Sequence, residues 1–205
     1  ATVAEIISKY GCIDICVANA GVLGATGVES RSEFIEEDWD MTFEVNVKGL
    51  VYTAWSVLPH MKERSAGKIV NIASHGGRTP RGNSVTGSTG TSMTPYGVSK
   101  AAAINWTQHL ALQVANFNIN VNVVCPGRLW TPMWEKIAIM QKNSDSSLAN
   151  QTTREIFLKS VKESFPLGRE QTPEDIGHAV AFFASDDAKV ITGQALNVNG
   201  GGVMD

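Results

Sequence analysis

The 205-residue chain is expected to form one α/β domain, in which a parallel β-sheet carries helices on both faces. Three observations predict this class. Short, nearly continuous apolar runs end at turn residues, which is typical of strands buried on both faces. Segments with helical spacing separate these runs, so βαβ crossovers join successive strands. The composition, 43% hydrophobic and 18% charged, supplies a sizeable core and excludes a disordered or fibrous chain.

The first half of the chain contains two predicted strands. Residues 1–11 have the pattern of the end of a polar helix, and the run CIDICVA at 12–18 is a buried strand. Residues 32–64 carry apolar side chains every three or four positions, which predicts helix. The run GKIVNIA at 67–73 is the second strand, and Ser74 follows directly at its end.

The second half repeats the alternation of helix and strand. It contains a long Ala-rich helix at 96–115 with Pro95 in its first turn, a strand at 119–125, a helix at 174–185 led by Thr172 as N-cap and Pro173, and a last strand at 195–198. Two stretches do not have the pattern of a helix or strand that packs in the core. Residues 78–93 are rich in Gly, Ser and Thr. Residues 128–171 form a long polar excursion, which we interpret as a substrate-binding lid within the single domain 1–205.

Composition and charge exclude several classes of partner. The net charge of −3 and the lack of a long basic tract argue against nucleic-acid binding. No apolar run approaches the ~20 residues that cross a bilayer, and the first residues do not form a signal peptide. Cys12, Cys16 and Cys125, with four scattered histidines, form neither a disulfide framework nor a metal-binding spacing. We therefore expect a cytoplasmic protein with no metal, nucleic-acid or membrane partner.

The strongest chemical signal is the pair Tyr96 and Lys100. Residues four apart lie on the same face of a helix, so the phenol and the ammonium project into the same space. A free tyrosine, with a pKa of about 10, is a poor base at neutral pH. A cation ~4 Å away stabilises the phenolate by roughly 4 kcal/mol at an effective dielectric of ~20, which predicts a lowered pKa for Tyr96. Such a phenol serves as a general acid or base.

The ends of the predicted strands bring further polar residues toward this pair. Ligands bind at the carboxyl edge of open α/β sheets, where Ser74, Asn19-Ala20-Gly21, Pro126-Gly127 and Thr131 are all expected. The Ser74 hydroxyl is placed to hold a carbonyl or alcohol oxygen while Tyr96 moves the proton. Each residue also fits a structural role: Ser74 as a turn residue or helix cap, Pro126-Gly127 as a plain turn, and Thr131 as an N-cap.

Six motifs occur in order: ANAG at 18–21, VNVKG at 45–49, NIAS at 71–74, YGVSK at 96–100, NVVCPGRLWTPM at 122–133 and ITGQALNVNGGG at 191–202. With them the chain resembles the short-chain dehydrogenase/reductase family over nearly its whole length. The resemblance implies a Rossmann-type doubly wound sheet. It also implies hydride transfer between NAD(P) and a secondary alcohol or ketone.

The resemblance assigns roles to individual residues. Tyr96 becomes the catalytic acid/base, Ser74 positions the substrate oxygen, and Lys100 lowers the Tyr96 pKa and binds the nicotinamide ribose. Asn46 holds a water that extends the proton relay, unless it merely bonds a neighbouring strand. The expected cofactor contacts are Asn19, Ala20, Gly21, Ile72, Tyr96, Lys100, Pro126, Gly127, Leu129, Thr131 and Met133, and the expected substrate contacts are Ser74, His75, Gly76, Tyr96, Trp130 and Trp134.

The chain departs from the family pattern at its start. The family begins with a strand, a glycine-rich turn of the TGxxxGxG kind and a helix, followed by a second strand that ends in a charged cofactor selector. The 205 residues contain none of these. We expect two βα units, roughly 60–75 residues, to be missing from a longer protein. The alternative is a shortened, inactive binding module. The charged residue that would select between NAD and NADP is therefore not among the 205 residues. The motif at the end of the chain weakly favours NAD over NADP.

A second departure lies between Ser74 and Tyr96, which are 22 positions apart, more than the family usually shows. The surplus, residues 81–93, is polar, and its Ser84, Ser88 and Ser92 are rival candidates for the substrate-holding serine. We favour Ser74 because the NIAS motif places it at the strand end.

The predicted lid indicates the class of substrate. Leu129, Trp130, Met133, Trp134 and Ile137 form an apolar stripe that fits a lid or a helix packed on the sheet edge. Because the lid has no Arg or Lys cluster to clamp a phosphate or carboxylate, we favour a small polyol, cyclic alcohol or hydroxyketone. An acyl-carrier substrate, as in a 3-oxoacyl-carrier-protein reductase, is the alternative.

By resemblance, helices 37–64 and 95–115 form a homodimer or homotetramer. Their apolar residues outside the sheet-facing stripe are Val51, Trp55, Trp106, His109 and Leu110.

Overall fold

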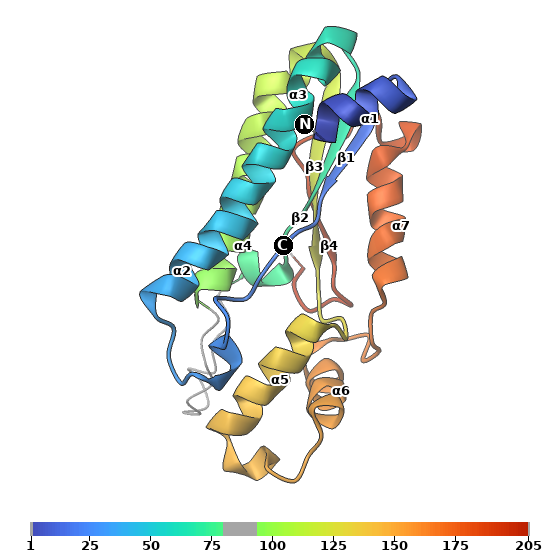
Figure 1. Ribbon diagram of the computed structural model, residues 1–205. Helices are drawn as coiled ribbons and strands as arrows, with labels where there is room; N and C mark the ends of the chain where they lie inside the picture. Colours follow the sequence, from blue (N-terminus) through green and yellow to red (C-terminus); the bar gives the residue numbers. More distant parts are fainter. Residues whose placement is uncertain (1, 80–93, 205) are drawn as a thin grey trace.

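The computed structural model describes residues 2–79 and 94–204 and contains one four-stranded parallel sheet with the order β1-β2-β3-β4 (Figure 1). The strands are β1 (Ile15–Ala18), β2 (Gly67–Ile72), β3 (Ile119–Pro126) and β4 (Ala195–Val198). In register, Ile15 pairs with Lys68, Gly67 with Ile119, and Val123 with Ala195. The predicted parallel α/β sheet is therefore confirmed, and all four strands lie where the apolar runs placed them.

Helices cover both faces of this sheet. α3 (Leu50–Arg64) and α4 (Thr94–Val114) lie along one face and α7 (Pro173–Ala184) lies on the other (Figure 1). Along β2 the side chains alternate: Ile69 packs into the α3/α4 core, while Val70 and Ile72 pack with residues of α7. This alternation explains why β2 is apolar at nearly every position.

The first strand does not follow this pattern completely. Cys16 and Ala18 are buried, but Ile15 and Val17 are 48% and 41% exposed. The sequence predicted that the 12–18 run is buried on both faces, and for β1 this was wrong. The physical reason is its place at the sheet edge, where β2 is its partner and no described element covers Ile15 and Val17.

The predicted helix at 32–64 consists of three parts. α2 (Glu36–Phe43) is followed by a π-helical segment, Glu44–Gly49, and then by α3. A π-helical turn shifts the side-chain positions around the helix axis and is common at functional sites. Here the segment carries Asn46, which is 1% exposed.

The long excursion after β3 is more ordered than the sequence predicted. It contains α5 (Pro132–Ser144), with Thr131 as the predicted N-cap, and also α6 (Thr153–Ser164). A parallel bridge between Leu129 and Gln171 closes the base of this lid. The capping box of α6, in which Thr152 and Glu155 bond each other's backbone, was the sequence signal that would have revealed this helix.

The remaining helix, α1 (Thr2–Tyr10), precedes β1 and has no buried residue. Among the described helices, none has the length and apolar character needed to cross a membrane.

Candidate active site

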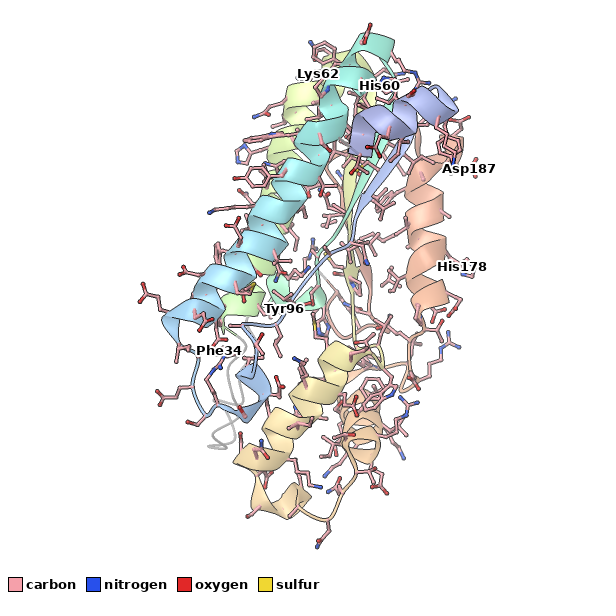
Figure 2. The ribbon with its side chains drawn as sticks, viewed as in Figure 1. Phe34, His60, Lys62, Tyr96, His178 and Asp187 are labelled. Atoms are coloured by element: carbon pink, nitrogen blue, oxygen red, sulfur yellow. The ribbon has the colours of Figure 1, made fainter. Side chains whose placement is uncertain are left out.

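Tyr96 is the third residue of α4 and lies between the carboxyl edge of the sheet and the lid (Figure 2). Ser74 follows β2 by two residues, caps a short 3-10 turn and accepts a hydrogen bond from the Gly76 N–H at 3.1 Å. The Ser74 hydroxyl lies near enough to the Tyr96 phenol to lower the pKa of that phenol. The structure thus joins Ser74 to Tyr96 despite their long separation, while the rivals Ser84, Ser88 and Ser92 lie outside the described residues.

The pKa of Tyr96 moves in the opposite direction to the one we expected. Burial of the phenol raises it, and the hydrogen bond from Ser74, which favours the phenolate, offsets only part of that rise. The sequence argument assumed that the Lys100 ammonium lies ~4 Å from the phenolate oxygen. The burial of the phenol, which that argument did not include, has the largest effect on its pKa, so the expected lowering does not occur.

Lys100 is 3% exposed, and its Nζ donates a hydrogen bond to the Ile72 backbone oxygen at 3.0 Å. Nζ also lies 5.6 Å from the centroid of the Tyr96 ring. Burial lowers the pKa of Lys100 to about 8, because a low-dielectric surrounding disfavours the ammonium. The group therefore remains mostly cationic at neutral pH.

Gly21 leaves space beside this ammonium. A Cβ at Gly21 would lie 3.2 Å from Lys100 Nζ and 3.4 Å from Asn46 Oδ1. Of the three N–H donors of Lys100, one binds Ile72, and the described residues provide no second acceptor. A buried cation with two spare donors beside a glycine suits the hydroxyl oxygens of a ribose, so the residues present fit the nicotinamide half of a dinucleotide.

Asn46 connects the π-helical segment to the loop after β1. Its Nδ2 donates to the Val22 oxygen at 2.9 Å and to Ser99 Oγ at 3.0 Å, and its Oδ1 accepts from the Val22 N–H at 2.8 Å. Ser99 Oγ in turn donates to the Tyr96 backbone oxygen at 2.7 Å. Both amide hydrogens of Asn46 are thus used within the protein. Its contacts make it a positioning residue and give no support to the predicted water-holding role.

The other predicted cofactor residues occupy the same sheet edge in different ways. Asn19 and Ala20 are exposed beyond β1, and Pro126 ends β3. The Gly127 N–H donates to the Val198 oxygen at 2.9 Å, which ties this turn to β4. Thr131 Oγ1 accepts from the Trp134 N–H, so its helix-capping alternative is observed. Leu129 packs against the hydrophobic cluster that contains Ile176 and Phe183 of α7, and Met133 packs against the cluster that contains Phe157 and Phe165.

The predicted substrate residues divide into two groups. His75 is buried and lies against Phe165, with ring centroids 5.6 Å apart, and Gly76 binds Ser74. Trp130 and Tyr96 are partly buried and pack against one hydrophobic cluster, the lid core. The lid core comprises Leu23, Val28, Trp134, Ile137, Met140, Phe157, Val161 and Phe165. Trp134 itself is 9% exposed within the lid core, where it supports the fold of the lid.

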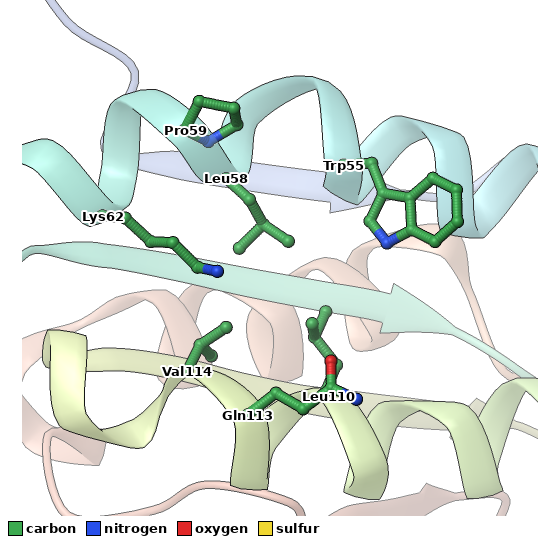
Figure 3. A pocket seen from close by; sticks show the side chains of 7 residues that line it. All are labelled: Trp55, Leu58, Pro59, Lys62, Leu110, Gln113 and Val114. Atoms are coloured by element: carbon green, nitrogen blue, oxygen red, sulfur yellow. The ribbon is translucent and has the colours of Figure 1, made fainter.

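A groove of about 230 Å³ lies between α3 and α4 and is separate from this site (Figure 3). Its lining residues on α4 run from Leu110 to Val114, at least fourteen positions after Tyr96, or about 20 Å along the helix. The lining is mostly apolar: Trp55, Leu58, Pro59, Lys62, Leu110, Gln113 and Val114. The groove therefore does not serve the chemistry at Tyr96.

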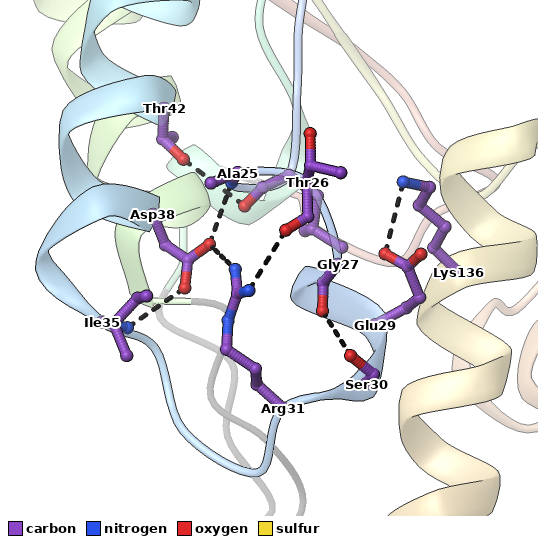
Figure 4. Close-up of polar contacts among 11 residues, drawn as sticks. Ala25, Thr26, Gly27, Glu29, Ser30, Arg31, Ile35, Asp38, Thr42 and Lys136 are labelled. Carbon is purple, nitrogen blue, oxygen red and sulfur yellow. Dashed lines mark hydrogen bonds and ion pairs between the residues drawn. The ribbon is translucent and has the colours of Figure 1, made fainter.

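A buried carboxylate organises the loop between β1 and α2 (Figure 4). Asp38 is fully buried and accepts hydrogen bonds from the Ala25 N–H at 2.9 Å, from the Ile35 N–H at 3.1 Å and from the Arg31 guanidinium. The same loop contributes Leu23 and Val28 to the lid core and pairs Glu29 with Lys136 of α5 at 3.3 Å. It thereby links the edge of the sheet to the lid.

A parallel sheet with a serine, a tyrosine and a lysine at its carboxyl edge is the arrangement of a Rossmann-type oxidoreductase. A family model described as "Enoyl-(Acyl carrier protein) reductase" matches residues 1–202. The chain therefore belongs to the short-chain dehydrogenase/reductase family, and the expected family and fold class are confirmed.

Individual relatives agree with this assignment. The chain is 35% identical over 202 residues to the 3-oxoacyl-[acyl-carrier-protein] reductase FabG of Thermotoga maritima, covering 98% of this chain and 71% of the relative. It is 37% identical over 202 residues to the 2,3-dihydro-2,3-dihydroxybenzoate dehydrogenase of Bacillus subtilis, covering 98% and 70%. The crystal structure of NAD+-bound xylitol dehydrogenase matches with a TM-score of 0.82 and 29% identity, covering 98% of this chain and 73% of that chain.

Proposed function

We propose that the protein is an NAD(P)-dependent oxidoreductase that interconverts a secondary alcohol and a ketone. The observation that carries the proposal is the juxtaposition of Ser74, Tyr96 and Lys100 at the carboxyl edge of the sheet: the Ser74 hydroxyl is near enough to lower the pKa of Tyr96, and the Lys100 ammonium lies 5.6 Å from the centroid of the Tyr96 ring. Relatives named as reductases and dehydrogenases support it, and solved relatives hold NAD+ or NADP. Because both cofactors occur among them, they give no support to the weak lean toward NAD.

The nicotinamide, when bound, takes a hydride in alcohol oxidation and returns it in ketone reduction. We assign its ribose hydroxyls to the spare donors of Lys100, beside Gly21. A bound nicotinamide would lie beside the turn at Pro126 and Gly127 and beside Thr131, which are at the same edge of the sheet. These residues account for the nicotinamide half of the dinucleotide.

The proton step belongs to Tyr96. In ketone reduction the phenol donates its proton to the carbonyl oxygen, and in alcohol oxidation the phenolate accepts the hydroxyl proton. The Ser74 hydroxyl holds the same substrate oxygen by hydrogen bonding. Because burial raises the Tyr96 pKa, the protonated phenol prevails at neutral pH. This protonation state suits Tyr96 to act as the general acid in ketone reduction near neutrality.

The lid arginines support an uncharged substrate. Arg154 is bound to Glu170 through both terminal nitrogens. Arg128 donates to the Ser160 oxygen and to Ser164 Oγ, and its guanidinium lies against the Trp134 and Phe165 rings. Since both charges already have protein partners, we propose a small polyol, cyclic alcohol or hydroxyketone as substrate.

A second candidate is a 3-oxoacyl-carrier-protein reductase, which the relative from Thermotoga maritima favours. The two candidates differ in the size of the substrate and in the need to dock an acidic carrier protein. Turnover of 3-oxoacyl-carrier-protein at a kcat/KM far above that of a free hydroxyketone would select the second candidate.

We also propose that the chain assembles as a homodimer or homotetramer through α3 and α4. Tyr52, Trp55 and Leu112 on these helices are 54%, 57% and 81% exposed. Two residues that the sequence placed on this face were assigned wrongly: Leu110 is buried in the core, and Trp106 packs partly against it. Both residues lie toward the side of α4 that faces the sheet. Because apolar residues occur around much of this helix, the sequence pattern did not separate its two sides.

The deciding experiment measures NAD(P)H oxidation with ketones and NAD(P)+ reduction with alcohols for the wild type and Tyr96→Phe. Loss of one hydroxyl keeps the ring packing, so the variant should fold normally and lose about 100- to 10,000-fold in kcat. Circular dichroism checks the fold. Near-normal turnover in Tyr96→Phe would refute the mechanism. A wild type that folds but neither binds nor turns over NAD(P)H would favour the inactive binding module.

A further inference from the structure

Arg154, the second residue of α6, reaches back to the base of the lid. Its Nη1 donates to Glu170 Oε1 at 2.9 Å and its Nη2 donates to Glu170 Oε2, so the ion pair is bidentate. The guanidinium carbon lies 5.1 Å from the ring centroids of both Trp130 and Phe157. One side chain thus binds a carboxylate with both terminal nitrogens while its guanidinium lies over two aromatic rings.

The two ends of the lid base come together at this arginine. The bridge between Leu129 and Gln171 joins the chain where it enters and leaves the lid. Trp130 directly follows the first of these residues, and Glu170 directly precedes the second. Arg154 therefore connects α6 to both sides of the lid base at once.

The arginine also contacts Trp130, which the sequence predicted as a substrate contact. Trp130 and Phe157 have ring centroids 5.2 Å apart, and the guanidinium carbon lies 5.1 Å from each, so the three groups contact one another in a triangle. Trp130 packs against the lid core, which Tyr96 also contacts. The indole and the reacting phenol therefore border the same hydrophobic cluster.

We propose that Arg154, held by Glu170, is a positioning residue that fixes the Trp130 indole and so limits the size of the alcohol or ketone that reaches Tyr96. The substrate-size part of this inference rests on the proposed function. The geometry calls for arginine: a lysine ammonium keeps the charge but offers neither the two-pronged contact nor a flat face for stacking.

The first test follows the lid itself and needs no substrate. Amide hydrogen exchange by mass spectrometry is compared in the wild type, Arg154→Met, Arg154→Lys, and Lys159→Met, which removes an exposed charge from the same helix. Arg154→Met should speed exchange at least tenfold in peptides 128–134 and 166–171 and leave 67–72 unchanged. Arg154→Lys should fall between, and Lys159→Met should match the wild type. Wild-type exchange in Arg154→Met, or faster exchange confined to α6, would overturn the proposal.

The second test measures substrate size. The ratio of kcat/KM for 1-phenylethanol to that for 2-propanol is determined with saturating NAD+ or NADP+. Arg154→Met should raise this ratio at least fivefold, chiefly through KM, and Arg154→Lys should restore part of the selectivity. An unchanged ratio would overturn the substrate-size role. If the wild type oxidises neither alcohol nor reduces the matching ketones, the proposed function and the size role fail together, whereas the exchange data still decide whether Arg154 holds Trp130.

Discussion

The Lys100 ammonium donates to the Ile72 backbone oxygen at 3.0 Å and lies 5.6 Å from the centroid of the Tyr96 ring. The lysine thus joins α4 to the end of β2. Burial disfavours the charged form of this side chain and lowers the pKa of Lys100 to about 8. The helical spacing of four residues places both side chains on one side of α4, but the neighbouring strand determines where the ammonium points.

This burial predicts a particular pH dependence of stability. Between pH 8 and 10.5 the unfolded chain keeps the Lys100 proton while the folded chain releases it. Because the unfolded state then binds more protons, the free energy of unfolding rises with pH in this window, by about 3 kcal/mol in total from this group. Urea unfolding at several pH values should show this rise in the wild type and not in Lys100→Met. Equal pH slopes for the two proteins would contradict it.

The hydroxyl pair at the site predicts an effect of Ser74→Ala on the pH profile. Removing the Ser74 hydroxyl leaves burial as the main influence on the phenol, so the Tyr96 pKa should rise further. The pH at which alcohol oxidation reaches half its maximum should increase, and kcat should fall about 100-fold because a donor to the substrate oxygen is lost. Ser74→Thr, which keeps a hydroxyl, should recover part of the rate. An unchanged pH profile in Ser74→Ala would exclude the proposed hydrogen bond.

The positions of the strands and the surroundings of Tyr96 could be predicted from the sequence because both depend on local sequence patterns. Apolar runs ended by turn residues defined β2 and β3, and parallel pairing brought Ser74 to the same edge as Tyr96. Alternate side chains of β1 are exposed because this strand lies at the edge of the sheet. An apolar run predicts a strand but does not fix the position of that strand in the sheet. The direction of the Tyr96 pKa shift depended on the burial of the phenol, which the spacing of residues does not fix.

The same limit applies to Asn46 and the lid. The VNVKG motif marked Asn46, but its bonds to Val22 and Ser99 come from a π-helical turn that hydrophobic periodicity does not distinguish from an α-helix. In the lid, the apolar stripe predicted α5, and the capping residues around Thr152 marked α6. The stacking of Arg154 on Trp130 joins residues 24 positions apart and required coordinates.

The space at Gly21 gives a prediction for cofactor binding. A methyl group there would lie 3.2 Å from Lys100 Nζ, which is tighter than ordinary contact. Gly21→Ala should therefore displace the ammonium and weaken NAD(P)H binding about tenfold, or ~1.4 kcal/mol. Fluorescence titration measures the affinity. Gly177→Ala, in α7, is the matched control: an added Cβ meets no atom within 4 Å, so the affinity should not change. Equal affinities for Gly21→Ala and the wild type would rule out this role of Gly21.

The buried Asp38 predicts how the loop between β1 and α2 responds to substitution and to acid. Burial alone would raise the Asp38 pKa, but hydrogen bonds from Ile35, Arg31 and Ala25 outweigh it and hold the pKa below its ordinary value. The stabilisation is therefore fully present above about pH 4 and is lost as the pH falls through the folded-state pKa. Asp38→Asn should reduce the free energy of unfolding by about 3 kcal/mol at pH 7, because it leaves the partly buried Arg31 without its counter-charge.

The matched control for Asp38 is the exposed neighbour Glu37 on the same turn of α2. Glu37→Gln should change the free energy of unfolding by no more than about 0.5 kcal/mol. Asp38→Asn should also make stability less dependent on pH between 4 and 2 than it is in the wild type. Because the loop contributes Leu23 and Val28 to the lid core, the same variant should speed amide exchange in α5. Equal stability of the two variants at pH 7 would show that the Asp38 carboxylate does not hold this loop.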